Sequence, residues 1–212
     1  MEVYSKITVS GVLQEGIGVG LKNAVSLVGA VFLWLITIWI PYLNVGTTIA
    51  IYNIPIELSK GKIISPTFIF DAKYRKFMGE FFILAGLESL AVTAAMTFLV
   101  IPGIVISIAW SLSYYIMFDK EIAPLEALIR SNKATYGYKW TIFLVQLVIV
   151  IATCVVCGIL ALILSNFLLF ILLLAVLICV MAISLGCTSV VYKKLTNEDE
   201  TQQMESEIAD FE

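Results

Sequence analysis

The 212-residue chain contains no histidine, and only 14% of its residues are charged. Without histidine, neither a serine–histidine or cysteine–histidine nucleophilic pair nor a histidine-ligated metal site can form. Ordinary soluble domains carry about 25% charged residues, so this chain has too few charges to cover a folded domain in water. The composition therefore predicts an integral membrane protein, with no enzymatic activity, no metal and no cofactor.

Cysteine is scarce, and all four cysteines lie within apolar stretches. The Cys154-x-x-Cys157 spacing is found in redox and metal motifs, but its neighbours here are small and aliphatic. We interpret these cysteines as small apolar packing residues, as we do Cys179 and Cys187. The series Gly16-x-Gly18-x-Gly20 superficially resembles a phosphate-binding loop, yet no predicted strand precedes it. Flexibility or close packing explains these glycines better.

Long apolar runs are what the sequence does contain. A helix needs about 20 apolar residues to cross the ~30 Å hydrocarbon core of a bilayer. Six runs qualify, at 23–40, 43–58, 78–100, 102–118, 140–164 and 167–191. We expect an all-α integral membrane protein with six transmembrane helices, arranged as three hairpins with cytoplasmic amphipathic helices. The run 43–58 is short and contains Pro55, so it could also be tilted, kinked or partly re-entrant.

These runs divide the chain into three expected parts. Residues 1–22 form an N-terminal cytoplasmic amphipathic segment, and residues 23–192 form the transmembrane domain. Residues 193–212 form an acidic tail, with seven carboxylates and no basic residue beyond position 195. Because such a tail has little to bury, we expect it to be disordered.

All 13 lysines and arginines lie outside the apolar runs and, in this topology, on one side of the membrane. The positive-inside rule makes that side cytoplasmic, together with both termini, in the plasma membrane of a prokaryote. We expect the basic loop residues to contact anionic lipid headgroups or a partner membrane protein, which could be a second copy. Nothing points to nucleic acid. The residues expected at this surface are Lys73, Arg75, Lys76, Arg130, Lys133 and Lys139.

The chain also resembles three copies of one unit, in which an amphipathic segment precedes a hairpin. The second and third amphipathic segments open with Ile64-Ser65-Pro66 and Ile122-Ala123-Pro124, and two hairpins turn at Ile40-Pro41 and Ile101-Pro102. Residues 124–136 predict a helix that ends before Gly137. This helix could lie on the membrane with its apolar face down, or fold back onto the bundle.

Residues 101–140 carry a resemblance to a known family. The stretches that carry it are Ile101-Pro102-Gly103-Ile104, Ser113-Tyr114-Tyr115, Phe118-Asp119, Pro124-Leu125-Glu126-Ala127, Arg130-Ser131 and Gly137-Tyr138-Lys139-Trp140. They resemble a bacterial polytopic membrane protein family of unknown function, which is similar to the membrane domain fused to some glycerophosphodiester phosphodiesterases. The resemblance implies a six-helix bundle. It brings no reaction, because the phosphodiesterase domain and its metal-binding carboxylates are absent.

Glu88 is the most informative polar residue within the apolar runs. It lies 11 residues beyond Phe77, about 16 Å deep in the bilayer at 1.5 Å per residue. An acidic group at that depth is costly and suggests a functional site, to which Gln146 and Asn53 could contribute. The alternative is a protonated acid bonded to a backbone carbonyl or to a hydroxyl such as that of Ser107 or Ser111.

Two classes of function follow from these patterns. The first is a structural or accessory membrane component that binds lipid or a partner protein, which fits the lack of catalytic residues and the charged cytoplasmic face. The alternative is a small transporter or channel that uses a polar intramembrane site around Glu88. A membrane enzyme fits least, because the chain lacks an acid–base or nucleophile set.

Overall fold

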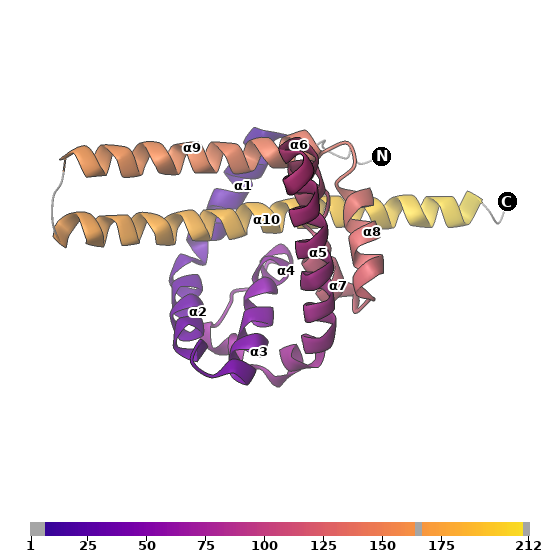
Figure 1. Ribbon diagram of the computed structural model, residues 1–212, viewed down its shortest axis with the longest axis horizontal. Helices are drawn as coiled ribbons and strands as arrows, with labels where there is room; N and C mark the ends of the chain where they lie inside the picture. Colours follow the sequence, from indigo (N-terminus) through magenta and orange to yellow (C-terminus); the bar gives the residue numbers. More distant parts are fainter. Residues whose placement is uncertain (1–6, 164–166, 210–212) are drawn as a thin grey trace.

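The structure is a computed structural model that describes residues 7–163 and 167–209, and over those ranges it is helical with no strand (Figure 1). The connection between the predicted spans 140–164 and 167–191, at Ser165-Asn166, lies outside the described residues. The elements are α1 (Val9–Lys22), α2 (Ala24–Thr37), α3 (Pro41–Tyr52), α4 (Ile54–Ser59), η1 (Pro66–Phe70), η2 (Ala72–Phe77), α5 (Met78–Phe98), α6 (Val100–Ala109), α7 (Ser113–Lys120), α8 (Pro124–Ala134), α9 (Lys139–Ile163) and α10 (Phe167–Ala209).

Four helical stretches are long and apolar enough to cross a membrane: Ala72–Phe98, Val100–Lys120, Lys139–Leu162 and Ile171–Thr196. They correspond to the last four of the six predicted spans, which are thereby confirmed as apolar helices of membrane-spanning length. The third and fourth predicted spans form one hairpin, α5 to α6–α7. The last two form a second hairpin, α9 and α10.

The first two predicted spans differ from expectation. Helix α2 has 14 residues, about 21 Å at 1.5 Å per residue, which is shorter than the hydrocarbon core. It reaches spanning length only together with α1, from which it bends by 68° at Asn23. The run 43–58 is broken at Asn53, before Pro55, into α3 and α4. Within the described residues there are thus four candidate spans, or five if the bent pair counts as one.

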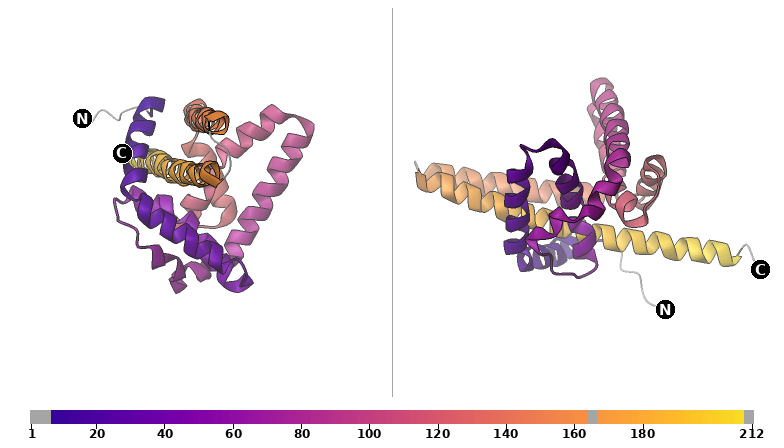
Figure 2. Two further views of the ribbon diagram at one scale, coloured as in Figure 1. Left: turned by 90° about the vertical axis from the view of Figure 1, so that its left-hand side faces the viewer. Right: turned by 90° about the horizontal axis from the view of Figure 1, so that it is seen from below.

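The two long hairpins point in different directions. Helices α9 and α10 lie side by side along the long axis of the molecule, whereas α5 and α6 rise away from that axis (Figures 1 and 2). The expected arrangement of six transmembrane helices as three hairpins is therefore not confirmed. Helices α2 and α3 form a third, shorter hairpin. The tips of the three hairpins are alike in chemistry, because each exposes large apolar side chains, such as Trp39, Phe98 and Leu162.

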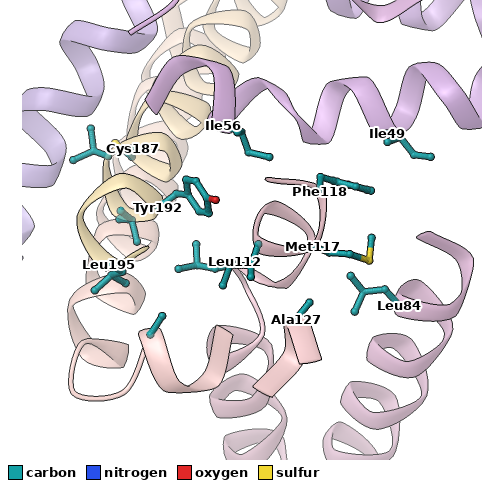
Figure 3. Packing of buried hydrophobic residues seen from close by; sticks show 14 of the residues in the cluster. Ile49, Ile56, Leu84, Leu112, Met117, Phe118, Ala127, Cys187, Tyr192 and Leu195 are labelled. Carbon is teal, nitrogen blue, oxygen red and sulfur yellow. The ribbon is translucent and has the colours of Figure 1, made fainter. Parts of the chain in front are cut away.

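The core lies where the hairpins meet, around α7 (Figure 3). Leu112, just before α7, and Met117 and Phe118 within it, pack among residues of α4, α5, α8 and α10. Leu84 of α5 and Leu195 of α10 are also fully or almost fully buried there. Because these residues come from distant parts of the sequence, α7 holds the two hairpins together.

Helix α1 crosses α10 at a contact made by small residues. A Cβ atom at Gly20 would meet the backbone of Ala182, and one at Gly186 would meet the backbone of Gly16 and Gly20. Nothing lies within 4 Å of a Cβ atom at Gly18. The glycine series near the N-terminus therefore serves helix packing at two of its three positions, which favours close packing over flexibility.

Helix α10 continues through residue 193, where the sequence predicted the start of a separate tail, and ends at Ala209. Leu195 is almost fully buried and Lys194 pairs with Glu15 of α1, so the first residues of the expected tail belong to the folded body. Beyond them the backbone is helical where we expected disorder. The glutamates, glutamines, methionine and alanine of this stretch are good helix formers.

Candidate functional site

Glu88 lines a hollow of about 400 Å³ between α3, α5, α6 and α7. Its other lining residues carry mostly hydroxyl groups: Tyr52, Ser89, Val92, Thr93, Ser107 and Tyr114. One carboxylate oxygen, Oε2, is buried and makes no hydrogen bond of acceptable geometry with any described residue. Glu88 is therefore half-buried in a polar recess, whereas the large exposed side chains elsewhere on α5 are apolar.

Aromatic rings form one wall of this recess. The rings of Tyr52 and Tyr114 stack with 4.7 Å between their centroids, and Phe81 lies 5.8 Å and 5.7 Å from them. Tyr52 and Tyr114 both line the recess, and stacking restricts the positions of their rings. Glu88 therefore shares the recess with two tyrosines that are held in place.

The neighbours of Glu88 differ from the pair we expected. The hydroxyl groups of Ser107 and Ser111 donate to carbonyls of their own helix turn, those of Ile104 and Ile108, each at 2.8 Å. The Glu88 carboxyl interacts instead with the hydroxyls of Ser113 and Tyr114. Ser113 Oγ is also buried, without a well-formed hydrogen bond in the described residues.

Asn53 and Gln146 do not converge with Glu88. Asn53 Nδ2 donates to the carbonyl of Ile49, 2.9 Å away in the preceding turn, and the residue is almost fully buried. Gln146 is exposed and lines another hollow, of about 240 Å³, with Ser184 and Thr188 of α10. The structure therefore does not bring these three polar residues together into one site.

The chemistry available at the recess is that of a single carboxyl group among hydroxyls. Such a group can exchange a proton, or bind a small cation or an ammonium group. No basic side chain lines the recess. Among the residues the structure describes, no three His, Cys, Asp or Glu side chains come together as a metal site.

The sequence left open whether α8 lies on the membrane with its apolar face down or folds back onto the bundle. In the structure one face of α8 packs on the bundle and the opposite face is uncovered. Its inner face, with Ala127, Leu128 and Ala134, is buried on the bundle, and Ser131 and Thr135 anchor it. Ser131 Oγ donates to the carbonyl of Ala109 at 2.8 Å and accepts from the amide of Leu112 at 3.2 Å. Those two backbone groups lie at the break between α6 and α7, where helix ends leave polar groups unpaired. The inner face of α8 thus stabilises the break.

The outer face of α8 remains apolar and uncovered. Leu125 and Ile129 expose 63% and 62% of their surface, and Tyr136 and Trp140 just beyond the helix expose 79% and 77%. In the folded chain this strip lies beside basic residues. The combination of exposed aliphatic, aromatic and basic side chains is typical of a helix that contacts a membrane surface or a partner.

Most of the predicted basic contact residues have acidic or polar partners within the chain. Arg130 pairs with Glu126 one turn away, Lys76 with Glu121 at 2.7 Å, and Lys73 with Asp71 at 3.6 Å. Lys139 Nζ donates to Asn132 Oδ1 at 3.0 Å. Of the remaining two, Arg75 lies with the stem of its side chain against Gly46 of α3. Lys133 also has an interaction partner. The surface is thus a layer of mixed charge rather than a purely basic patch.

Asp119 organises this charged layer, and the sequence analysis gave it no role. Its carboxylate accepts from Lys60 Nζ and, at 2.6 Å, from the hydroxyl of Tyr192, so it joins the end of α4 to α7 and α10. Its signals in the sequence were its position directly after an apolar run and its place in the Phe118-Asp119 stretch of the resemblance. It became informative only once the fold brought Lys60 and Tyr192 to it.

Comparison of this chain with known protein families, with characterised proteins and with solved structures finds no match.

Proposed function

We propose that this protein is a multi-pass component of a prokaryotic plasma membrane that acts by binding anionic lipid and a partner membrane protein, without catalysing a reaction. In this proposal both termini and the charged layer around Asp119 face the cytoplasm. The three apolar hairpin tips, which include Trp39, Phe98 and Leu162, lie in or beyond the bilayer. The partner is either a second copy of the chain or a different membrane protein.

The observation that carries this proposal is the outer face of α8. A helix that is firmly anchored on one side, through Ser131 and Thr135, holds Leu125 and Ile129 in fixed positions on the other. Burying these side chains against lipid or protein is favourable by roughly 1.5–3 kcal/mol each. A rigid, uncovered apolar strip is thus ready to bind without further ordering of the chain.

Two further features of the proposal rest on the sequence. The resemblance of residues 101–140 to the membrane domain of some glycerophosphodiester phosphodiesterases agrees with a non-catalytic membrane part. The order of amphipathic segment and hairpin also recurs along the chain: α1 before α2–α3, η1–η2 before α5–α6, and α8 before α9–α10. We infer a repeated unit in which the amphipathic segment sits at the cytoplasmic surface.

The second candidate function, a small transporter or channel, is favoured by the recess around Glu88. A half-buried carboxyl group without a basic partner, facing hydroxyls of Ser113 and Tyr114, is what a proton- or cation-coupled path requires. The recess lies beside a single carboxylate, however, and no second acidic residue lines it.

Site-specific photo-crosslinking in membranes tests the preferred function. A benzophenone amino acid at Ile129 should crosslink to phospholipid or to one partner protein, because this position lies on the uncovered face of α8. The same probe at Ile63, which is 78% exposed in the loop after α4, is the matched control. Identical products from both positions, or none from Ile129, would contradict a specific binding face.

A further inference from the structure

A groove of about 550 Å³ runs between α6 and the start of α9. Aliphatic side chains of α6, among them Ile104, Val105 and Ile108, form one wall, and Trp140 and Phe143 of α9 form the other. Its lining is almost wholly apolar. The volume falls within the range of about 300–1,000 Å³ that small-ligand sites occupy, and the apolar walls favour a hydrocarbon occupant.

Among the described residues that line this groove, Lys139 is the one charged residue and none is acidic. Its ammonium group makes one hydrogen bond to Asn132, which leaves N–H donors for another acceptor because an ammonium group has three. Tyr136 and Trp140, with a phenolic hydroxyl and an indole N–H, line the groove next to it. Such amphipathic rings favour the headgroup level of a bilayer.

A second apolar groove provides an internal comparison. It has a volume of about 450 Å³ and is lined by residues of α1, α9 and α10, including Leu13, Val148 and Val176. No charged residue lines it. A hydrocarbon chain would fit either groove. Of the two, only the α6–α9 groove has a cation, Lys139, that can bind the phosphate of a lipid.

We propose that the α6–α9 groove binds one anionic glycerophospholipid, with an acyl chain along Ile104, Val105 and Ile108 and the phosphate at Lys139. The charge of Lys139 and the absence of lining carboxylates select an anionic headgroup over a zwitterionic one. This lipid site is a more specific form of the proposed function. It rests on that function only in assuming that the chain lies in a membrane.

Native mass spectrometry of the purified full-length chain in a neutral detergent tests the site. The probes are phosphatidylglycerol and phosphatidylcholine with the same acyl chains, each titrated onto delipidated protein. We expect one bound phosphatidylglycerol and a preference of about fivefold over phosphatidylcholine, the size expected for one basic residue at an anionic headgroup. A protein that binds both lipids equally would overturn the proposal.

Matched variants locate the lipid. Val105→Trp fills the α6–α9 groove and should remove the bound phosphatidylglycerol, whereas Val148→Trp fills the comparison groove and should leave it. The two valines are 44% and 42% exposed, so the substitutions are equally tolerable. Equal loss of phosphatidylglycerol in both variants would contradict this location.

The headgroup contact has its own test. Lys139→Gln should lower phosphatidylglycerol binding to the level of phosphatidylcholine, while Lys62→Gln, at an exposed lysine after α4 that pairs with Glu57, should not. Both side chains are at the surface, so the variants remain informative even if Val105→Trp does not fold. An unchanged preference in Lys139→Gln would overturn the assignment of the phosphate.

The outcome is separable from that of the proposed function. Crosslinking from Ile129 reports on the outer face of α8, and neither Ile129 nor Leu125 lines the groove. A chain that crosslinks from Ile129 to a partner but shows no preference for phosphatidylglycerol keeps the partner-binding part of the proposed function and loses the lipid site. A chain that binds one phosphatidylglycerol but crosslinks to nothing keeps the lipid site and loses the binding face of α8.

Discussion

Replacing Gly20 by alanine should destabilise the protein, because α1 and α10 touch at this point through their backbones. The added Cβ atom would lie 2.7 Å from the carbonyl carbon of Ala182 and 3.1 Å from the Cα atom of Ile183. Backbone atoms cannot move aside as a flexible side chain can. Overpacking costs about 1–3 kcal/mol, and the better helix propensity of alanine returns about 0.5–1 kcal/mol, so a net loss of about 1–2 kcal/mol is expected.

Gly18→Ala is the matched control, since it lies on the same helix and its added Cβ atom would meet nothing within 4 Å. It should stabilise the protein by about 0.4–1 kcal/mol. For a chain of this length, 1 kcal/mol corresponds to about 2–4 °C in melting temperature. Gly20→Ala should therefore lower the Tm by about 2–8 °C and Gly18→Ala should raise it slightly.

Thermal melting of both variants in one detergent, at one scan rate, measures this difference. The scan rate matters because unfolding of such proteins is often irreversible, and the apparent Tm then depends on it. Shifts of the same sign and size would refute the reasoning, because they would mean that α1 does not cross α10 at Gly20. A fall in Gly18→Ala alone would place the crossing on the other face of α1.

Two further predictions concern the tail and the topology. Truncation after Lys194 removes the almost fully buried Leu195 and should lower the Tm by several degrees, whereas truncation after Thr196 keeps Leu195 and should leave the Tm nearly unchanged; equal melting would show that Leu195 contributes nothing. A cysteine at Asn44, in a cysteine-free background, should react with a membrane-impermeant maleimide in intact cells, and one at Thr201 should not. Labelling at Thr201 from outside would reverse the orientation.

The long helices were predictable from hydropathy. The predicted spans 78–100 and 140–164 became α5 (Met78–Phe98) and α9 (Lys139–Ile163), because an uninterrupted apolar run of that length has few alternatives to a helix. Helix α8 was also predictable, because Pro124 indicated its start and Gly137 its end. In the structure α8 begins at Pro124, and Gly137, just beyond its end, adopts a positive φ of 85°.

Bends and long-range contacts were not predictable in the same way. Hydropathy counts apolar residues without regard to direction, so it could not show that the chain turns by 68° at Asn23. The position of Pro55 did indicate an irregular second run, which breaks at Asn53. Glu88 was recognised by its depth, but its neighbours Ser113 and Tyr114 depend on how α5 packs against α7.

Transport by the purified chain tests the central claim most directly. Proteoliposomes containing the wild type, Glu88→Gln or the exposed same-helix control Glu80→Gln are screened for uptake of ions and metabolites under a proton gradient. If the proposed function holds, uptake should be no greater than in protein-free liposomes for all three, because Glu88 then has only a structural role. Uptake by the wild type and Glu80→Gln that disappears in Glu88→Gln would contradict the account and establish a transporter.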